Sequence, residues 1–472
     1  MEGWIRAEYI VAYSGGGHKI LKNGFMKIEN GRIADVRRAL DPSVPFLDLG
    51  NKTICPGFIN LHCHGDAPMS KSFMEDAGNP FLYQSTMYDH AMIQRYDAEA
   101  ADAAFRLTLS ELLLNGCTTI VDSGSGFSPR FARTAGEFGI RAYVGACYRS
   151  GLFYTKDGRT VEYPYDDAAG AAQMERAVAD LKEFDGAFGG RIKMILAPTQ
   201  TTTCTPEILE MTRKEADRLG VLITIHAAEL AVEFQECVRR YGKTPVGYLK
   251  STGLLEPDVI VGHCILISGH SAVNYPGGGD MELLSESGAT VAHSPWVFAR
   301  RGIALESYPD YLKHGINVGL GTDTFPADYF REMRCACAVG KLLKRDCFAA
   351  TAADVFNSAT LCGAKALGRT DIGRLSPGAK ADFLVFDNET SEMSPLRDPI
   401  RNIVYSATRD SIESVYIDGQ LAADKGKIPG RNNREDARLV QAAAEKMWAN
   451  APDYDWKKRN ADELSPQTFP EF

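Results

Sequence analysis

Three features that would point to particular classes of protein are missing from the sequence. Basic residues are not in excess: 52 lysines and arginines stand against 61 acids, for a formal net charge of −9. This balance argues against a nucleic-acid partner bound through a basic field. No window reaches the roughly 18 uninterrupted apolar residues that a membrane-spanning helix needs. The opening MEGWIRAEYI has no apolar core resembling a signal peptide. We therefore expect a cytoplasmic protein with neither a membrane nor a nucleic-acid partner.

Paired cysteines are also lacking. The eleven cysteines are odd in number and scattered, and no CxxC pair occurs among them. In a chain this large, such a distribution is typical of reduced, buried thiols in the cytoplasm. Hydrophobic residues nevertheless make up 44% of the chain. That is enough apolar material to offset chain entropy, so a disordered chain is excluded.

Short strands are predicted at both ends of the chain. Near the start, YIVAYS, GFMKIENG and RIADVRRA alternate apolar and polar residues and are bounded by Gly and Asn. A similar pattern returns near the end in ADFLVFD, NIVYSAT and SVYIDGQLAAD. Two β-rich pieces at opposite ends indicate one discontinuous domain. We predict a β-sandwich composed of residues 1–55 and 373–428.

The middle of the chain, residues 56–372, alternates strand and helix. Eight apolar, β-branched runs are each followed by a helical pattern, as buried parallel strands should be. The runs are FINLHCH, CTTIVDSG, RAYVGACY, RIKMILAPT, VLITIHAAE, DVIVGHCI, ATVAHSP and NVGLGTD. Helix signals support the pattern: Asp97 can cap one helix, and Thr205 and Gly220 bracket another. Eight strand–helix units predict an α/β protein with a (β/α)₈ TIM barrel.

The last segment, residues 429–472, turns polar. Residues 435–450 have a helical pattern, and the tail that follows is rich in charge and proline. This segment is predicted to be either a surface-packed extension or an oligomer arm. We expect a homodimer or a higher homo-oligomer.

Polar residues stand at the ends of five of the eight predicted barrel strands. Five of the chain's nine histidines lie at these ends, together with one aspartate. Barrel active sites form at this end of the strands. The residues are His62, His64, His226, His263, His293 and Asp323.

This pattern predicts a metal site. His62 and His64, at i and i+2 on one strand, point to the same side, so both imidazoles can reach one ion at about 2.0–2.1 Å. His226 and Asp323 would converge on the barrel axis. Imidazole with carboxylate suits Zn²⁺, Fe²⁺, Co²⁺ or Mn²⁺ better than Ca²⁺ or Mg²⁺, and zinc is our first choice. His293 is expected to be structural rather than a ligand.

Six motifs taken together resemble the amidohydrolase superfamily. They are PGFINLHCH, ITIHAAE, VGHCI, GLGTD, REMR and GRLSPGAKADFLVFD. The similarity is greatest to its branch of atrazine and melamine hydrolases, guanine deaminases and cytosine deaminases, and it covers about residues 5–428. The resemblance implies a metal-dependent (β/α)₈ barrel enzyme that hydrolyses carbon–nitrogen bonds other than peptide bonds.

The resemblance also implies roles for individual residues. His62, His64, His226 and Asp323 would hold the metal. Glu229 would shuttle protons between water and leaving group, and His263 would hydrogen-bond the water or the developing oxyanion; with Asp323 these two form the expected catalytic set. Members with two metals use a carboxylated lysine at the end of strand 4. Here Lys193 stands at the start of that strand, so one divalent transition metal is expected.

Two departures from the family pattern bear on the substrate. Strand 7 leads into HSPWVFAR rather than into the His-Cys-Pro and Ser-Asn of the deaminases, and Thr199-Gln200 follows strand 4 where a histidine is frequent. Trp296 and Phe298 are therefore predicted to line the substrate pocket, although Trp296 could instead pack as core. Tyr83 and Met87 are weaker candidates for the facing wall. Such a pocket would favour an apolar or aryl group, as in the phenylurea and molinate (thiocarbamate) hydrolases.

The leading hypothesis is metal-dependent hydrolysis of a small urea, carbamate or amide bearing an apolar or aryl group. The alternative is hydrolytic deamination or dechlorination of an aminoheterocycle of the triazine, pterin, purine or pyrimidine type. A larger amine as product would favour the first and ammonia the second. A catalytically inactive scaffold is disfavoured because all four expected ligands and Glu229 are present. A lyase or isomerase using the same metal stays open, since fold does not fix reaction.

Overall fold

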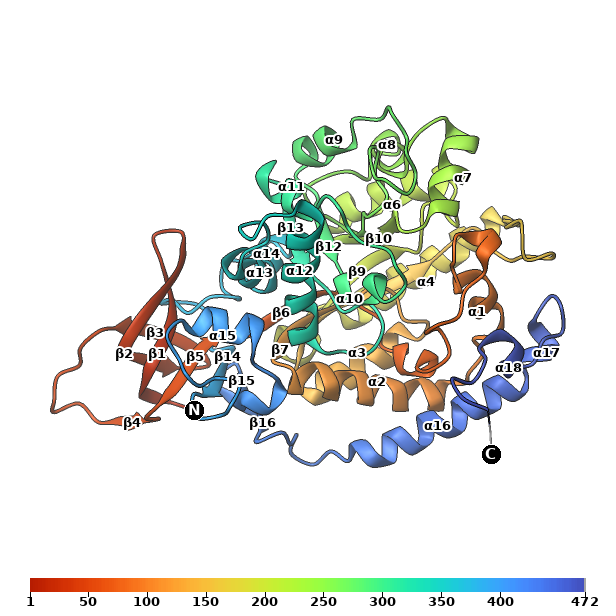
Figure 1. The fold of residues 1–472 in the computed structure, drawn as a ribbon. Helices are drawn as coiled ribbons and strands as arrows, with labels where there is room; N and C mark the ends of the chain where they lie inside the picture. The colour runs from red at the N-terminus through yellow and green to blue at the C-terminus, as the bar shows by residue number, and fades with distance from the viewer. Residues whose placement is uncertain (471–472) are drawn as a thin grey trace.

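A closed barrel of parallel strands forms the centre of the molecule. The computed structural model describes residues 1–470, apart from the side chains of residues 90–92. Eight strands lie side by side in chain order (Figure 1). They are β6 (Phe58–Cys63), β7 (Cys117–Asp122), β8 (Arg141–Tyr148), β9 (Ile192–Pro198), β10 (Ile223–Ala227), β11 (Val259–His263), β12 (Thr290–His293) and β13 (Asn317–Leu320). The predicted α/β class and (β/α)₈ barrel are confirmed.

The barrel closes where its first and last strands meet. A parallel bridge joins Cys63 to Asp323. The backbone N–H groups of Thr322 and Asp323 donate to the carbonyl of His62 at 2.9 and 2.8 Å. The carboxyl ends of β6 and β13 are thereby fixed to each other, at the place where their polar residues stand.

Helices surround the barrel (Figure 1). Asp97 accepts a hydrogen bond from the N–H of Ala100 and so begins α2, and Gly220 ends α6 with a φ of 67° that suits glycine. The helices of this part are α1 (Met87–Ile93), α2 (Ala98–Leu114), α3 (Ser128–Phe138), α4 (Asp167–Phe184), α5 (Ala187–Gly190), α6 (Pro206–Leu219), α7 (Ala231–Tyr241), α8 (Pro245–Ser251), α9 (Asp280–Ser287), α10 (Pro295–Ala299), α11 (Tyr308–Lys313), α12 (Tyr329–Lys344), α13 (Ala352–Ala359) and α14 (Leu361–Ala366). Among the described residues, none of the helices is both long and apolar enough to cross a membrane.

A second sheet combines strands from both ends of the chain. Its order is β16-β15-β14-β5-β1-β2-β3, with β4 paired to β1. The strands are β1 (Gly3–Ser14), β2 (Gly17–Glu29), β3 (Arg32–Arg37), β4 (Phe46–Asp48), β5 (Lys52–Pro56), β14 (Phe383–Asp387), β15 (Ile412–Ile417) and β16 (Gln420–Asp424). It is a single curled, mixed sheet with its own buried core, lying beside the amino-terminal end of β6 (Figure 1).

One predicted strand is wrong. NIVYSAT lies mostly in helix α15 (Pro399–Tyr405). The carboxylate of Asp398 accepts from the N–H groups of Ile400 and Arg401 at 3.0 and 3.3 Å, and Pro399 occupies the first helical position. This local capping outweighs the strand preference of Ile403 and Val404, which are buried instead on one helix face.

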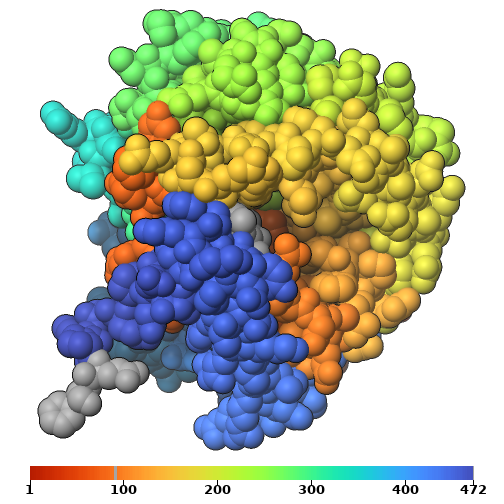
Figure 2. Space-filling view, turned by 90° about the vertical axis from the view of Figure 1, so that its right-hand side faces the viewer, coloured from red at the N-terminus to blue at the C-terminus, as the bar shows by residue number. Residues whose placement is uncertain are grey.

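The C-terminal segment packs against helices α1 and α2 of the barrel. It contains α16 (Asn433–Ala449), α17 (Ala451–Tyr454) and α18 (Ala461–Leu464), and α16 packs along α2. Figure 2 shows this segment, in blue, beside a hollow in the face of the molecule. Of the two predicted roles, the structure shows packing against the surface of the same chain.

Candidate active site

A cavity of about 760 Å³ opens at the carboxyl end of the barrel strands. Five of the expected metal-binding and catalytic residues line it, together with polar side chains that follow the neighbouring strands. The first group is His64, His226, Glu229, His263 and Asp323; the second includes Ser123, Gln200, Arg301 and Thr324. The strand ends therefore supply one shared site.

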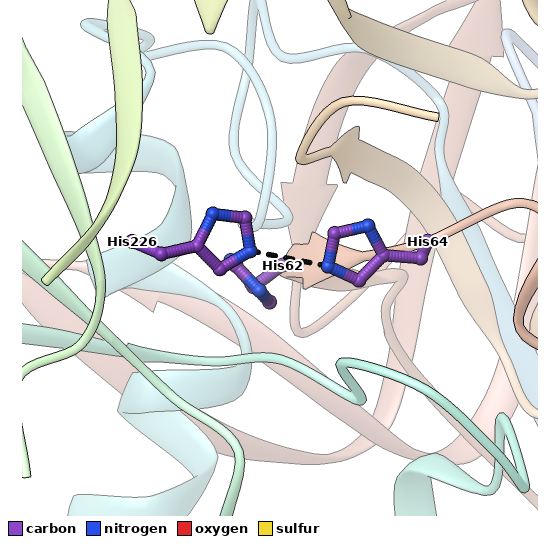
Figure 3. A group of neighbouring side chains, drawn as sticks. All are labelled: His62, His64 and His226. Carbon is purple, nitrogen blue, oxygen red and sulfur yellow. Dashed lines mark hydrogen bonds between the residues drawn. The ribbon is translucent and has the colours of Figure 1, made fainter. Parts of the chain in front are cut away.

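Three imidazoles meet at the floor of this cavity. His62 and His64 come from β6 and His226 from β10 (Figure 3). The Nε2 atoms of His64 and His226 are 3.2 Å apart. Two nitrogens bound to one ion at about 2.0–2.1 Å would be about 3–3.5 Å apart, so this spacing fits two ligands of one metal.

The carboxylate of Asp323 completes the cluster. Its Oδ1 atom lies 3.5 Å from Nε2 of His62 and 3.4 Å from Nε2 of His64. His263 and Asp323 have φ angles of 75° and 55°, in the left-handed region that non-glycine residues seldom adopt. Such backbone strain costs on the order of 1–3 kcal/mol and is typical of functional sites.

Hydrogen bonds to the far nitrogens orient two of the imidazoles. Nδ1 of His62 lies 2.8 Å from the hydroxyl of Ser123, and Nδ1 of His226 lies 2.7 Å from the carbonyl of Thr199. A proton on each Nδ1 leaves the lone pair of Nε2 directed to the cluster, as metal-binding histidines require. Nε2 of His62 is buried and has no hydrogen-bond partner among the described residues. The residues present therefore fit a divalent ion.

Ser123 and its neighbour Asp122 were not predicted to support the site, although the DSG sequence at the end of the second barrel strand was a signal. Asp122 accepts hydrogen bonds from the N–H groups of Ser125 and Gly65, at 3.1 and 3.3 Å, and so fixes the chain immediately after His64. Burial raises the pKa of Asp122 to about 6.

The electrostatics of the cluster favour neutral imidazoles and an ionised carboxylate. Burial lowers the pKa of His226 and His263 well below the ordinary value. Burial also lowers the pKa of His62, although Asp323 partly opposes it. Burial alone would raise the pKa of Asp323, but the close approach of His62 and the nearby His263 and His64 hold it well below its usual range. These are the protonation states in which both residue types bind metals.

Glu229 lies beside the cluster in a different environment. Burial raises its pKa to about 8, and the charges of Asp323 and Glu233 act in the same direction. The carboxylate of Glu233 accepts hydrogen bonds from the N–H groups of Ala228 and Glu229, at 3.0 and 2.7 Å, which fixes the backbone beside Glu229. A carboxyl group that can hold a proton near neutral pH is suited to general acid–base chemistry.

The predicted substrate-binding residues divide between the cavity and its surroundings. Met87 lines the cavity, as expected. Tyr83 is 47% exposed and its hydroxyl accepts a hydrogen bond from Gln235, outside the cavity lining. Phe298 is buried behind His263, with ring centroids 4.8 Å apart.

Trp296 is also outside the cavity lining. Its indole ring lies under the guanidinium of Arg331, 5.0 Å from the ring centroid, and its backbone N–H donates to Glu332 at 2.9 Å. Both aromatic side chains belong to the short helix α10. Neither predicted aromatic is among the residues that line the cavity: Trp296 packs against α12, and Phe298 packs against the imidazole of His263.

Two further expectations concern residues outside the cluster. His293 is buried, and its ring packs 5.0 Å from the ring of Tyr308, so the structural role expected for it fits its position. Burial lowers the pKa of His293 to about 3. Lys193 stands near the start of β9 and forms an ion pair with Asp185 at 3.2 Å, away from the metal cluster.

Known proteins similar to this chain include several deaminases. A 5'-deoxyadenosine deaminase of Methanothermobacter thermautotrophicus is 28% identical over 435 residues, covering 90% of this chain and 95% of the relative. A 5-methylthioadenosine/S-adenosylhomocysteine deaminase of Desulfitobacterium hafniense is 29% identical over 430 residues, covering 89% and 93%.

Solved structures share the fold. An adenosine deaminase from Xanthomonas campestris with bound zinc has a TM-score of 0.80 at 22% identity, with 94% of this chain and 98% of that chain covered. An atrazine chlorohydrolase from Arthrobacter aurescens complexed with zinc has a TM-score of 0.77 at 19% identity, with 93% and 99% covered.

The family assignment rests on a match over most of the chain. The sequence profile of the amidohydrolase family matches residues 53–422. This range contains all eight barrel strands and all the residues of the histidine–carboxylate cluster. The chain therefore belongs to the amidohydrolase family and is a hydrolase that acts on carbon–nitrogen bonds other than peptide bonds.

Proposed function

We propose that this protein hydrolytically deaminates an amino-substituted heterocycle, with adenosine-like compounds as the first substrates to test. The observation that carries the proposal is the placement of Glu229 beside the histidine–carboxylate cluster in one cavity. The deaminases among the relatives support this reaction over urea or carbamate hydrolysis. The reaction consumes water at the ring carbon that bears the amino group and releases ammonia, leaving an oxo group.

One divalent metal, with zinc as first choice, would be held by His62, His64, His226 and Asp323. When bound, it would supply a Lewis acid that lowers the pKa of a coordinated water toward ~7. The displaced position of Lys193 supports one metal rather than two, because no lysine side chain at the end of β9 is available to bridge a pair.

Glu229 and His263 would act on the substrate from the cavity wall. Glu229 would take a proton from the attacking water and deliver it to the leaving amine. His263, largely neutral because burial lowers its pKa, would hydrogen-bond the oxygen of the attacking water and orient it toward the ring carbon. The electron pair displaced by the addition would move to the adjacent ring nitrogen, which takes up a proton. Neither role requires a bond to the metal.

The urea and carbamate interpretation loses its main support in the structure. It depended on two aromatic side chains in the pocket, and neither Trp296 nor Phe298 lines the cavity. Polar groups such as Ser123, Gln200 and Arg301 lie there instead. These groups suit a heterocycle with several hydrogen-bonding atoms better than an aryl group. Dechlorination of a triazine is the second candidate, favoured by the fold shared with an atrazine chlorohydrolase.

Product analysis tests the proposal. Purified, metal-loaded protein would be incubated with adenosine, 5'-deoxyadenosine, a chlorotriazine, a phenylurea and a thiocarbamate. We expect ammonia and the corresponding oxo product from at least one aminoheterocycle. Release of an alkyl- or arylamine from the urea, with no ammonia from any heterocycle, would contradict the proposal.

A further inference from the structure

Two adjacent arginines follow α10, and their surroundings differ. Arg300 is satisfied by protein groups: it donates to Glu75 at 2.6 Å and to Thr324 at 3.2 Å, and its guanidinium lies 4.3 Å from the centroid of the Phe325 ring. Arg301 lines the cavity that also contains Glu229. The two side chains therefore allow a direct comparison.

Arg301 lacks the partners that its neighbour has. The hydrogen-bond contact found for its side chain is a weak one, from Nη2 to the sulfur of Met74 at 3.9 Å. Its Nε is buried and has no hydrogen-bond partner among the described residues. Within the part of the chain that the structure describes, no carboxylate lies within ion-pair distance of its guanidinium. A cation with strong donors thus lines the cavity with only the weak sulfur of Met74 as a protein acceptor.

Such an arrangement is costly unless a ligand completes it. A buried polar group without a partner costs about 1–3 kcal/mol, and more when it is charged. The planar guanidinium presents a fork of donors that matches an oxygen acceptor, and a carboxylate above all. Met74 offers only a weak acceptor. The missing partner is therefore expected on the molecule that fills the cavity.

The position of Arg301 limits which part of that molecule it meets. Arg301 follows β12, while Glu229 follows β10 and His263 ends β11. The charge of Arg301 is close enough to Glu229 to lower the pKa of that carboxyl group, against the larger effect of burial. A substrate whose amino group lies at Glu229 would thus present the neighbouring part of its ring, or a short substituent there, to Arg301.

We propose that Arg301 is a specificity residue that binds an oxygen acceptor on the substrate, either a ring carbonyl or a carboxylate, close to the carbon that loses ammonia. This inference rests on the proposed deaminase function and narrows its substrate class to amino-oxo or aminocarboxylate heterocycles. Adenine has no such oxygen, so it would be a poorer substrate than its oxygen-bearing analogues. The residue touches the substrate rather than the metal.

Matched purines test the proposal by turnover. Ammonia release would be measured for adenine, 2-oxoadenine, 8-oxoadenine and 6-aminopurine-2-carboxylate with the metal-loaded enzyme. We expect kcat/KM for at least one oxygen-bearing analogue to exceed that for adenine by tenfold or more. Arg301→Gln should reduce this preference about 10- to 100-fold, the effect of a lost hydrogen bond to a charged donor. Comparing the oxo and carboxylate analogues shows which acceptor is bound.

Arg300→Gln is the matched control, because it removes the same charge at the adjacent position from a side chain already paired with Glu75. It should leave the preference ratio unchanged whatever it does to the absolute rate. Arg301→Met should keep or raise the melting temperature of the ligand-free enzyme, since it removes an unpaired charge. An unchanged preference in Arg301→Gln, or a preference for adenine in the wild type, would overturn the proposal.

Equilibrium binding separates this inference from the proposed function. Titration calorimetry with xanthine and hypoxanthine, which differ by one ring carbonyl, requires no turnover. Xanthine should bind at least tenfold more tightly, and Arg301→Gln should remove that difference. Ammonia release without any dependence on Arg301 would overturn this inference alone. Arg301-dependent binding without ammonia release from any heterocycle would overturn the proposed reaction alone, and absence of both would overturn both.

Discussion

Burial gives Glu229 a different chemistry from the carboxylate of Asp323. Both side chains line one cavity, yet burial raises the pKa of Glu229 to about 8, whereas the histidines hold the pKa of Asp323 far below its usual range. One carboxyl group is therefore suited to carry a proton and the other to bind a cation. This separation supports distinct catalytic and metal-binding roles.

Replacing Glu229 by Gln tests that separation. The amide keeps the size of the side chain but cannot exchange the proton, so turnover should fall about 10²- to 10⁴-fold. Elemental analysis should find the same metal content as in the wild type. Loss of metal in step with activity would identify Glu229 as a ligand and contradict the proposed role.

The variant Trp296→Ala tests whether the Trp296 side chain packs in the protein core or lines the substrate pocket. Because the indole packs against Arg331 outside the cavity, we expect a lower melting temperature with KM nearly unchanged for every substrate. Loss of a large, partly buried aromatic side chain typically destabilises by about 1–4 kcal/mol. Thermal unfolding and steady-state kinetics on the same sample provide the check. A KM that rises for aryl-bearing substrates alone would restore Trp296 to the pocket.

Two elements outside the barrel attach to it through specific contacts. The hairpin of β1 and β2 carries His18, whose Nε2 lies 3.0 Å from the hydroxyl of Thr360 and whose ring contacts Phe356 edge-on at 5.1 Å. The C-terminal segment contacts α1, which contributes Met87 to the cavity wall. The first contact connects the second sheet to the barrel, and the second contact stabilises a wall of the site.

The His18 contact should make stability depend on pH. Burial, helped by the charge of Arg374, lowers the pKa of His18 to about 4. A folded-state pKa below the unfolded value means that unfolding takes up a proton, so stability falls as pH drops from about 6.5 to 4 and is fully present above that range. The pKa difference corresponds to about 3 kcal/mol. Denaturant titrations at several pH values should show a shallower decline for His18→Gln than for the wild type; identical slopes would contradict this assignment.

The C-terminal segment should affect substrate binding through Asp89. This buried carboxylate on α1 accepts from Arg459 at 2.7 Å and from the indole of Trp456 at 3.1 Å. Arg459→Gln should loosen α1 and raise KM about tenfold, or ~1.4 kcal/mol, while metal content stays unchanged. Lys458→Gln, at an exposed neighbouring position, is the control and should leave KM as in the wild type. Equal KM values in both variants would show that the segment has no role at the site.

At the scale of the whole molecule, the fold and the site could be predicted from the sequence where apolar runs and metal-binding residue types occurred together. The eight barrel strands could be predicted because each is a buried β-branched run, and the cluster could be predicted because each member ends such a run. Asp398 and Pro399 show the opposite case, since local capping turned an apparent strand into a helix. The direction of Trp296 depends on how α10 packs on α12, and the unsatisfied Arg301 depends on contacts between distant segments. Neither the direction of Trp296 nor the missing partner of Arg301 can be read from the sequence alone.

The most direct test of the account is a metal titration of activity. Protein freed of metal by chelation would receive increasing zinc while ammonia release from its best heterocyclic substrate is followed. The geometry of His62, His64, His226 and Asp323 predicts that activity rises linearly and saturates at one equivalent per chain, and that His226→Ala stays inactive at every ratio. Activity that survives chelation, or saturation only at two equivalents, would contradict the single-metal hydrolase described here.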